Sequence, residues 1–305
     1  MTQRDVVLSR RSMLVATAAT MALGACGGSG TATDSSGSAS GESDGESDSR
    51  DASGAGGEFA LVRYSIDPSV TVGADRRLAV GLADLDGTLR VDGPPELTAT
   101  LLGIDEAPLG AVTGRRRDEA IGVPYYEFRL DVPDSGIYTL RVELDSASQE
   151  TSFSVAEAGA LAFAEPGEQL EPFDTPTVAD PGGIDSICTR DPACPFHAVT
   201  LTDALAGGTP VVYLIGTPAF CQTGVCGPIL DVLIDVAAET PDVAFVHAEV
   251  YADSAATVVA PAVEASGLAF EPVVFLADAS GVLVERLDVI VDRSELRDRI
   301  ALLTA

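Results

Sequence analysis

Two cysteines separated by four residues are the side chains of this sequence best suited to chemistry. Cys221 and Cys226 follow closely on the apolar run Val211–Ile215. That run predicts a buried strand, and the cysteines lie where the strand would pass into a helix. The first turn of a helix offers unpaired N–H groups and a positive dipole end, which stabilise a thiolate. The pair therefore suits redox exchange or metal binding, or it forms one structural disulfide that clamps the turn.

The first 26 residues are typical of an export signal. Two arginines precede the apolar run Met13–Ala25, and this run is shorter than the roughly 20 residues that a helix needs to span a bilayer. Residues 9–14 resemble a twin-arginine signal, and residues 23–26 resemble a bacterial lipobox. The resemblance implies that Cys26 becomes a lipidated first residue, which anchors the protein on the extracytoplasmic face of the cell membrane. The alternatives are an uncleaved anchor and an ordinary signal peptide.

Export would place the remaining four cysteines in a compartment where disulfides persist. Four cysteines allow three connectivities, and local pairing is the simplest of them. Cys188 and Cys194 lie in a proline-rich loop, so we expect a structural disulfide between them. The alternative is a second redox pair that relays electrons to Cys221 and Cys226.

The charge of the chain excludes one class of function. Acidic residues number 47 and basic residues 18, every basic residue is arginine, and the formal net charge is −29. Such a surface repels nucleic acid, so we expect no nucleic-acid partner. The only basic cluster, Arg115–Arg117, is followed by two acidic residues and predicts a solvated loop.

Composition divides the chain into segments. Residues 27–58 are almost entirely small, polar or acidic, which predicts a flexible tether. Residues 59–156 alternate apolar and polar residues between turn clusters, which predicts an antiparallel β-sandwich. Within them, Asp134–Tyr138 resembles the tyrosine corner of immunoglobulin-like domains. We expect this sandwich to be a spacer or a partner-binding module, and residues 157–187, rich in Pro, Gly and acids, to be a linker that packs onto the next domain.

Residues 188–305 have a different pattern. Strands are predicted over 210–215, 243–250, 273–276 and 282–289, and helices over 226–240 and 254–266. A last helix follows Asp292, which with Glu295 forms a predicted capping box. The resulting order is β-α-β-α-β-β-α. The sequence therefore predicts a multidomain protein with an all-β N-terminal part and an α/β C-terminal domain.

This order, with a cysteine pair after the first strand, resembles the thioredoxin fold. Pro228 falls inside the helix near the position where thioredoxins carry a kinking proline, and Pro272 precedes the third strand, where the family places a cis-proline facing the active-site thiols. The family has two residues between its cysteines, whereas this chain has four. Five residues of helix rise about 7.5 Å, beyond the roughly 4.4–6.8 Å that a disulfide tolerates. We therefore expect Cys221 to lie in the turn before the helix, with Gly224 in an unusual backbone conformation.

The resemblance implies thiol–disulfide exchange on exported proteins, by a monomer without a bound cofactor. Cys221 would be the exposed nucleophile, Cys226 would resolve the mixed disulfide, and Pro272 would shape the substrate groove. The first alternative is a binding or scaffold lipoprotein in which both cysteine pairs are structural. The second is copper or zinc delivery through Cys221, Cys226 and His247, similar to thioredoxin-like copper chaperones, although the spacing differs. We expect His197 to be structural, and a lone strand histidine such as His247 is more often a core residue.

Overall fold

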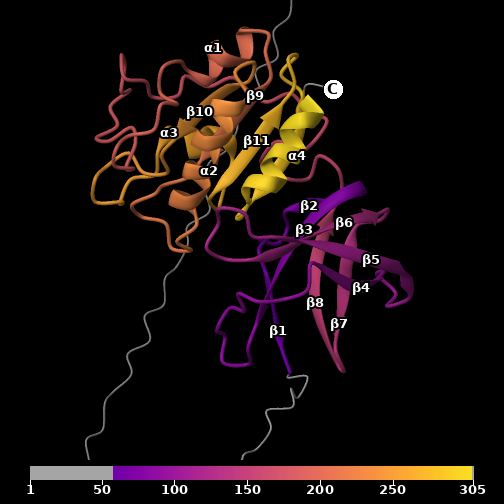
Figure 1. The fold of residues 1–305 in the computed structure, drawn as a ribbon. Coiled ribbons are helices and arrows are strands. Elements are labelled where there is room, and N and C mark those ends of the chain that lie inside the picture. The colour runs from indigo at the N-terminus through magenta and orange to yellow at the C-terminus, as the bar shows by residue number, and fades with distance from the viewer. Residues whose placement is uncertain (1–57, 304–305) are drawn as a thin grey trace, which may run out of the picture. The chain divides into compact units, whose positions relative to one another are not determined.

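The structure is a computed structural model in which residues 58–303 are described. The predicted export signal, the lipobox with Cys26 and residues 27–57 of the predicted tether lie outside the described residues. The chain is mostly β, with a curled eight-stranded sheet followed by a four-stranded sheet and four helices among the described residues (Figure 1). None of the helices described is both long and apolar enough to cross a bilayer.

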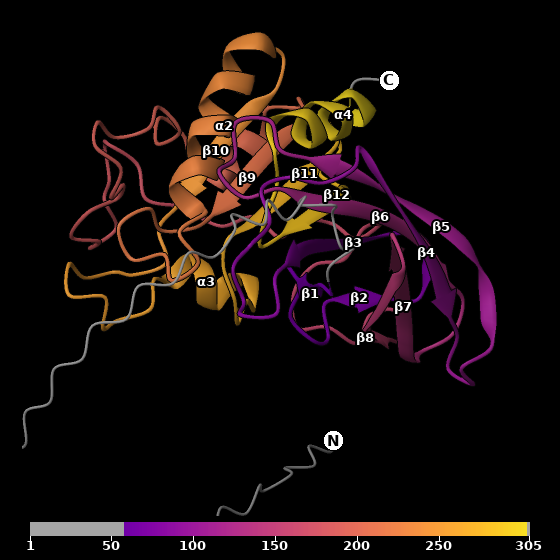
Figure 2. The same cartoon turned by 60° about the horizontal axis from the view of Figure 1, so that its bottom comes forward.

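The larger sheet is a single hydrogen-bonded unit. Its strands are β1 (Ala60–Arg63), β2 (Val70–Thr71), β3 (Gly73–Ala83), β4 (Glu96–Leu102), β5 (Pro108–Arg117), β6 (Tyr125–Val132), β7 (Gly136–Leu144) and β8 (Ala147–Ala156). Their order is β1-β3-β6-β5-β4-β7-β8-β2, and only the β2–β8 pair is parallel. Figure 2 shows the curl of this sheet.

The sequence predicted two separate sheets packed face to face, and β5 is the reason for the difference. Residues 108–115 of β5 pair with β4, whereas its last three residues, Arg115–Arg117, pair with β6. One long strand therefore joins two halves that would otherwise form a sandwich. The curl still encloses an apolar core, in which the Tyr138 and Phe153 rings stack 5.9 Å apart. The Tyr138 hydroxyl donates to the Asp134 carbonyl at 2.9 Å, the bond that a tyrosine corner requires.

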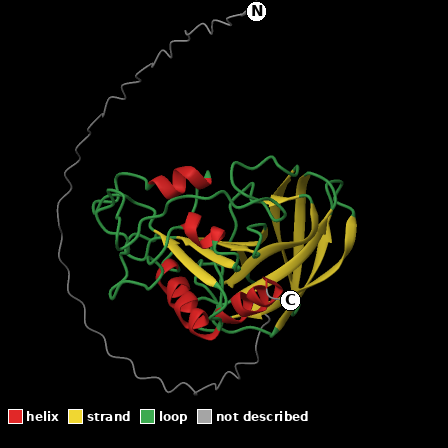
Figure 3. Cartoon of the chain, turned by 90° about the horizontal axis from the view of Figure 1, so that it is seen from above, coloured by secondary structure: helices red, strands yellow, loops and turns green. Residues whose placement is uncertain are grey.

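The smaller sheet lies between two layers of helices (Figure 3). Its strands are β9 (Val211–Ile215), β10 (Ala244–Ala248), β11 (Val273–Ala277) and β12 (Leu283–Asp288), in the order β10-β9-β11-β12. The helices are α1 (Leu201–Ala206), α2 (Cys226–Glu239), α3 (Pro261–Ser266) and α4 (Arg293–Leu303). From β9 onward the predicted order β-α-β-α-β-β-α is confirmed, and α1 precedes it.

Every residue of β9 and β11 is buried because helices cover both faces of the sheet. Val212 and Leu214 pack with residues of α2 and α4, while Val211, Tyr213 and Ile215 pack with residues of α1 and α3. Strands buried on both faces read as continuous apolar runs, as β9 does in the sequence.

Part of the segment predicted to be a linker, residues 157–187, packs along the β11–β12 hairpin. Gly167 N–H donates to the Leu283 carbonyl at 2.7 Å, and Leu283 N–H donates to the Glu168 carbonyl at 2.8 Å. Both sheets and this segment belong to one compact unit of the chain.

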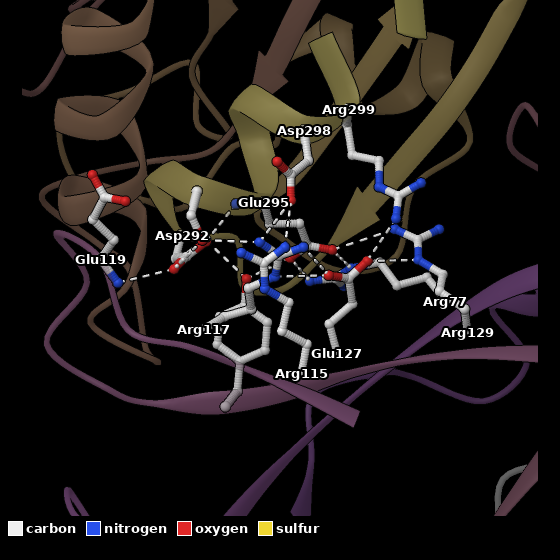
Figure 4. Close-up of polar contacts among 12 residues, drawn as sticks. Arg77, Arg115, Arg117, Glu119, Glu127, Arg129, Asp292, Glu295, Asp298 and Arg299 are labelled. Atoms are coloured by element: carbon white, nitrogen blue, oxygen red, sulfur yellow. Dashed lines mark hydrogen bonds and ion pairs between the residues drawn. The ribbon is translucent and has the colours of Figure 1, made fainter. Parts of the chain in front are cut away.

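Charged side chains buried between the two sheets connect the larger sheet to α4 (Figure 4). Glu295 is fully buried and accepts hydrogen bonds from Arg77 Nε at 2.6 Å and Nη2 at 2.8 Å, and from the Tyr125 hydroxyl. Arg117 is also buried and binds Glu127, with Nη2 to Oε2 at 2.5 Å. The prediction of a solvated loop for Arg115–Arg117 was therefore wrong, because these residues end β5 and Arg117 finds its acidic partner on the neighbouring strand β6.

The capping box at α4 is confirmed in one half. The Asp292 carboxylate accepts the Glu295 N–H at 2.6 Å, as predicted. The Glu295 side chain does not return to the Asp292 N–H, because it pairs with Arg77. The Tyr125 hydroxyl accepts the Asp292 N–H instead, at 2.9 Å.

We predict that Glu295→Gln lowers the free energy of unfolding by about 3 kcal/mol, because it leaves the Arg77 guanidinium buried without its negative partner. The matched control is Glu150→Gln, in the exposed pair between Arg141 and Glu150, which should cost less than about 1 kcal/mol. Urea unfolding of both variants measures the difference. Equal losses would show that the buried pair contributes no more than a surface pair.

Candidate active site

Cys221 and Cys226 form a disulfide with their Cα atoms 6.0 Å apart. Helix α2 begins at Cys226, so Cys221 lies in the turn before it. Gly224, within that turn, has a φ of +72°. The predicted position of Cys221 before the helix is therefore confirmed, and the unusual backbone conformation expected of Gly224 is a left-handed one.

The two sulfur atoms have different surroundings. Cys226 is buried at the first turn of α2, whereas Cys221 is partly exposed. Cys221 Sγ accepts a hydrogen bond from the Cys226 N–H at 3.2 Å and lies 3.3 Å from the Thr223 hydroxyl. Both groups can donate to a thiolate, so a reduced Cys221 would be stabilised at the helix N-terminus. This is the setting of an attacking sulfur at Cys221 and a resolving sulfur at Cys226.

A carboxyl group that sequence reasoning missed lies beside the buried sulfur. Glu271 Oε2 is 3.7 Å from Cys226 Sγ and accepts the Thr217 N–H at 3.0 Å. Burial raises the pKa of Glu271 to about 7. A carboxyl group with this pKa holds or releases a proton near neutral pH. The sequence did place Glu271 directly before Pro272, and this position could have indicated that Glu271 lies near the cysteines.

Pro272 lies beside Gly216, which follows β9 and precedes the cysteine turn. The Glu271–Pro272 peptide is cis, as the resemblance implied. A Cβ placed on Gly216 would lie 3.2 Å from Pro272 Cβ and 3.8 Å from Cys226 Cβ. The glycine therefore lets the proline and the cysteine approach each other across the end of β9.

A groove with a volume of ≈ 410 Å³ adjoins Cys221. Its lining is largely apolar and comes from the cysteine turn, the segments that follow β10 and α3, and α3 itself. The apolar and aromatic residues of this lining include Ile215, Val250, Tyr251, Val259, Val263, Leu268 and Phe270. A partner segment lying in this groove would pass beside the more accessible sulfur.

Cys188 and Cys194 are free thiols in the structure, so the expected structural disulfide is not formed. The Cys194 thiol turns instead toward two histidines: Sγ lies 3.5 Å from His247 Nδ1, which lies 3.2 Å from His197 Nε2. The pKa of Cys188 is lowered, chiefly because the Cys194 thiol hydrogen-bonds to it and also through both histidines. The pKa of Cys194 is raised by that same bond.

Among residues 58–303, one group of His, Cys, Asp and Glu side chains has the geometry to hold a metal ion. It consists of Cys188, Cys194, His197 and His247, all buried, with ligand atoms within 4.8 Å of one another. The structure thus places His247 with the other cysteine pair and does not assemble the predicted set of Cys221, Cys226 and His247. The closeness of Cys188, Cys194 and His197 in the sequence could have indicated this metal site. The expected disulfide between the two cysteines left no thiol free to bind a metal, so the site was not predicted.

No protein-family model matches this chain, and no curated protein matches it. Two solved structures of FetP from uropathogenic E. coli strain F11 are similar to part of it. The as-isolated protein is 17% identical, covers 32% of this chain and 87% of its own, and has a TM-score of 0.21. The copper-bound E46Q variant of FetP is 18% identical, covers 32% and 93%, and has a TM-score of 0.19. Scores this low assign neither fold nor function.

We predict that Gly224→Ala lowers the free energy of unfolding of the oxidised protein by about 1–2 kcal/mol. The cause is the cost of a left-handed φ for a residue with a Cβ, because no atom lies within 4 Å of the position of that Cβ. Gly227→Ala is the matched control, since its surroundings are equally open and it lies within α2, where alanine is favoured. Chemical unfolding of both oxidised variants measures the effect, and a neutral Gly224→Ala would contradict it.

Proposed function

We propose that this chain is a membrane-anchored extracytoplasmic protein that performs thiol–disulfide exchange on exported proteins through Cys221 and Cys226. One observation carries the proposal. At the first turn of α2, one sulfur of the disulfide is accessible beside an apolar groove, and the other is buried against a carboxyl group. Anchoring through a lipid on Cys26 rests on the resemblance of the export signal.

The fold that we propose for each part agrees with this activity. The element order from β9 to α4 and the position of Pro272 immediately before β11 support a thioredoxin-like domain. The hydrogen bond from the Tyr138 hydroxyl to the Asp134 carbonyl supports an immunoglobulin-like fold for the larger sheet. The division of this sheet into two halves that β5 joins also supports it. Fold alone does not carry function, so the proposal depends on the chemistry of the cysteine turn.

The exchange can be written with its atoms balanced. A partner thiolate attacks Cys221 Sγ, a mixed disulfide forms, and the electron pair of the broken bond goes to Cys226 Sγ, which takes a proton from Glu271. A second partner thiolate then attacks the partner's sulfur in the mixed disulfide. Cys221 leaves as a thiolate, stabilised by the Cys226 N–H and Thr223. The partner loses two electrons and the cysteine pair gains them; the reverse sequence reduces a partner disulfide.

The groove beside Cys221 suits an extended protein segment. Val259, which lines the groove, is 44% exposed. Apolar side chains that flank a partner cysteine would bury surface here, which favours exchange with protein thiols over small soluble ones.

We predict that Cys226→Ser forms a stable mixed disulfide at Cys221 with a peptide that carries one activated disulfide, because no resolving thiol remains. Cys221→Ser is the matched control and should react at least about 10-fold more slowly, since the sulfur of Cys226 is buried. Intact-mass spectrometry of both variants measures the adduct. If neither variant reacts, and the wild-type disulfide resists mild reductants, the bond is a permanent structural link and the protein is a binding or scaffold protein.

We predict that Glu271→Gln slows reduction of the disulfide on the order of 100-fold at pH 6. The protonated carboxyl group donates to the leaving Cys226 sulfur, and it loses its proton as the pH rises through about 7. The ratio of wild-type to variant rate should therefore fall between pH 6 and pH 8. Measuring this ratio cancels the ionisation of the reducing thiol. A ratio that does not change with pH would exclude Glu271 as the proton donor.

A further inference from the structure

The buried cluster of Cys188, Cys194, His197 and His247 brings four possible ligand atoms within 4.8 Å of one another, and two of the distances among them match a tetrahedral metal site. The two cysteines and His197 come from the loop before α1, and His247 comes from β10. Zn–N bonds of about 2.0–2.1 Å and Zn–S bonds of about 2.3 Å give tetrahedral edges of about 3.3 Å between nitrogens and about 3.6 Å between nitrogen and sulfur. The observed distances are 3.2 Å for His197 Nε2 to His247 Nδ1 and 3.5 Å for His247 Nδ1 to Cys194 Sγ.

Hydrogen bonds to backbone carbonyls orient both imidazoles toward this centre. His247 Nε2 lies 2.9 Å from the Gly216 carbonyl, and His197 Nδ1 lies 3.3 Å from the Pro176 carbonyl. A carbonyl only accepts, so both of these nitrogens carry the proton. The opposite nitrogens of the two rings face each other at 3.2 Å, and each presents a lone pair when its ring carries only this one proton. A metal ion bound between these nitrogens would use both lone pairs, and outward hydrogen bonds of this kind are typical of metal-binding histidines.

We propose that Cys188, Cys194, His197 and His247 bind one zinc ion. Two thiolates and two neutral imidazoles balance the double charge of Zn²⁺, and a neutral centre suits a site whose four ligands are all buried. Cu⁺ in the same site would leave a net negative charge in the core. Tetrahedral coordination by two sulfurs and two nitrogens is a zinc geometry. On binding, the two thiols each lose one proton, and no electron is transferred.

The site would be structural because all four coordination positions are filled by buried side chains. The ion would link the loop that precedes α1 to strand β10, two segments 50 residues apart in the sequence. It would also prevent Cys188 and Cys194 from exchanging with the Cys221–Cys226 disulfide. The proposal is independent of the proposed exchange activity, since the two sites share no cysteine.

The test is the metal content of the full chain, purified without a histidine tag and with zinc present. We expect one zinc per chain, with X-ray absorption showing two sulfurs at about 2.3 Å and two nitrogens at about 2.0–2.1 Å. Losing a hydrogen bond to a metal ligand typically lowers metal affinity roughly 10–100-fold. Cys194→Ser removes a ligand itself and should therefore lower zinc affinity by more than this. The double variant Cys221→Ser/Cys226→Ser is the matched control and should keep its zinc while losing exchange activity.

Three results would overturn the zinc assignment. They are a Cys188–Cys194 disulfide in the metal-free wild type, retention of zinc at full affinity in Cys194→Ser, and binding of Cu⁺ with zinc excluded. If Cys194→Ser does not fold, the wild type decides the question. Removing zinc with a chelator must then abolish the X-ray absorption signature of two sulfur and two nitrogen ligands. Adding zinc back must restore it.

Discussion

The parallel pairing of β9 with β10 is the constraint on which the chemistry of this protein depends. Parallel strands end at the same edge of a sheet, and Ile215 and Ala248 are paired at that edge. Val273, the first residue of the antiparallel strand β11, pairs with Ile215 there too. Three segments distant in the sequence therefore converge: the cysteine turn after β9, His247 near the end of β10, and Glu271 with Pro272 before β11. Both proposed sites lie at this edge.

Two buried carboxyl groups of this chain have pKa shifts of opposite sign, because only one of them has arginine partners. Glu271 is half-buried without an arginine partner, and desolvation raises its pKa to about 7. Burial also opposes ionisation of Glu127, yet Arg129 and Arg117 lower its pKa to about 2. The ionised Glu127 therefore contributes its full stabilisation at pH values above the ordinary pKa of a carboxyl group. This contribution is lost as the pH falls toward 2. Glu127 is thus held ionised by its arginines, whereas Glu271, beside the disulfide, remains able to exchange a proton.

The sequence predicted features that depend on neighbouring residues and failed on features that depend on distant ones. Spacing alone placed Cys221 outside the helix with Gly224 in a special conformation, and both are confirmed. The acidic residues that follow Arg115–Arg117 predicted a solvated loop, but the neighbouring strand β6 supplies Glu127 as a buried partner of Arg117. Loop chemistry alone paired Cys188 with Cys194, because nothing in the local sequence shows that two histidines approach them.

The sequence by itself determined the order of elements in the C-terminal part and the position of the cysteine pair at the start of a helix, since apolar periodicity and helical rise are local properties. The tertiary structure alone decided that the larger sheet is continuous, that Glu271 faces Cys226, and that His197 and His247 meet. These contacts join residues 45 and 50 positions apart. Strand register and packing bring such residues together, and neither property can be read from the residues adjacent to them.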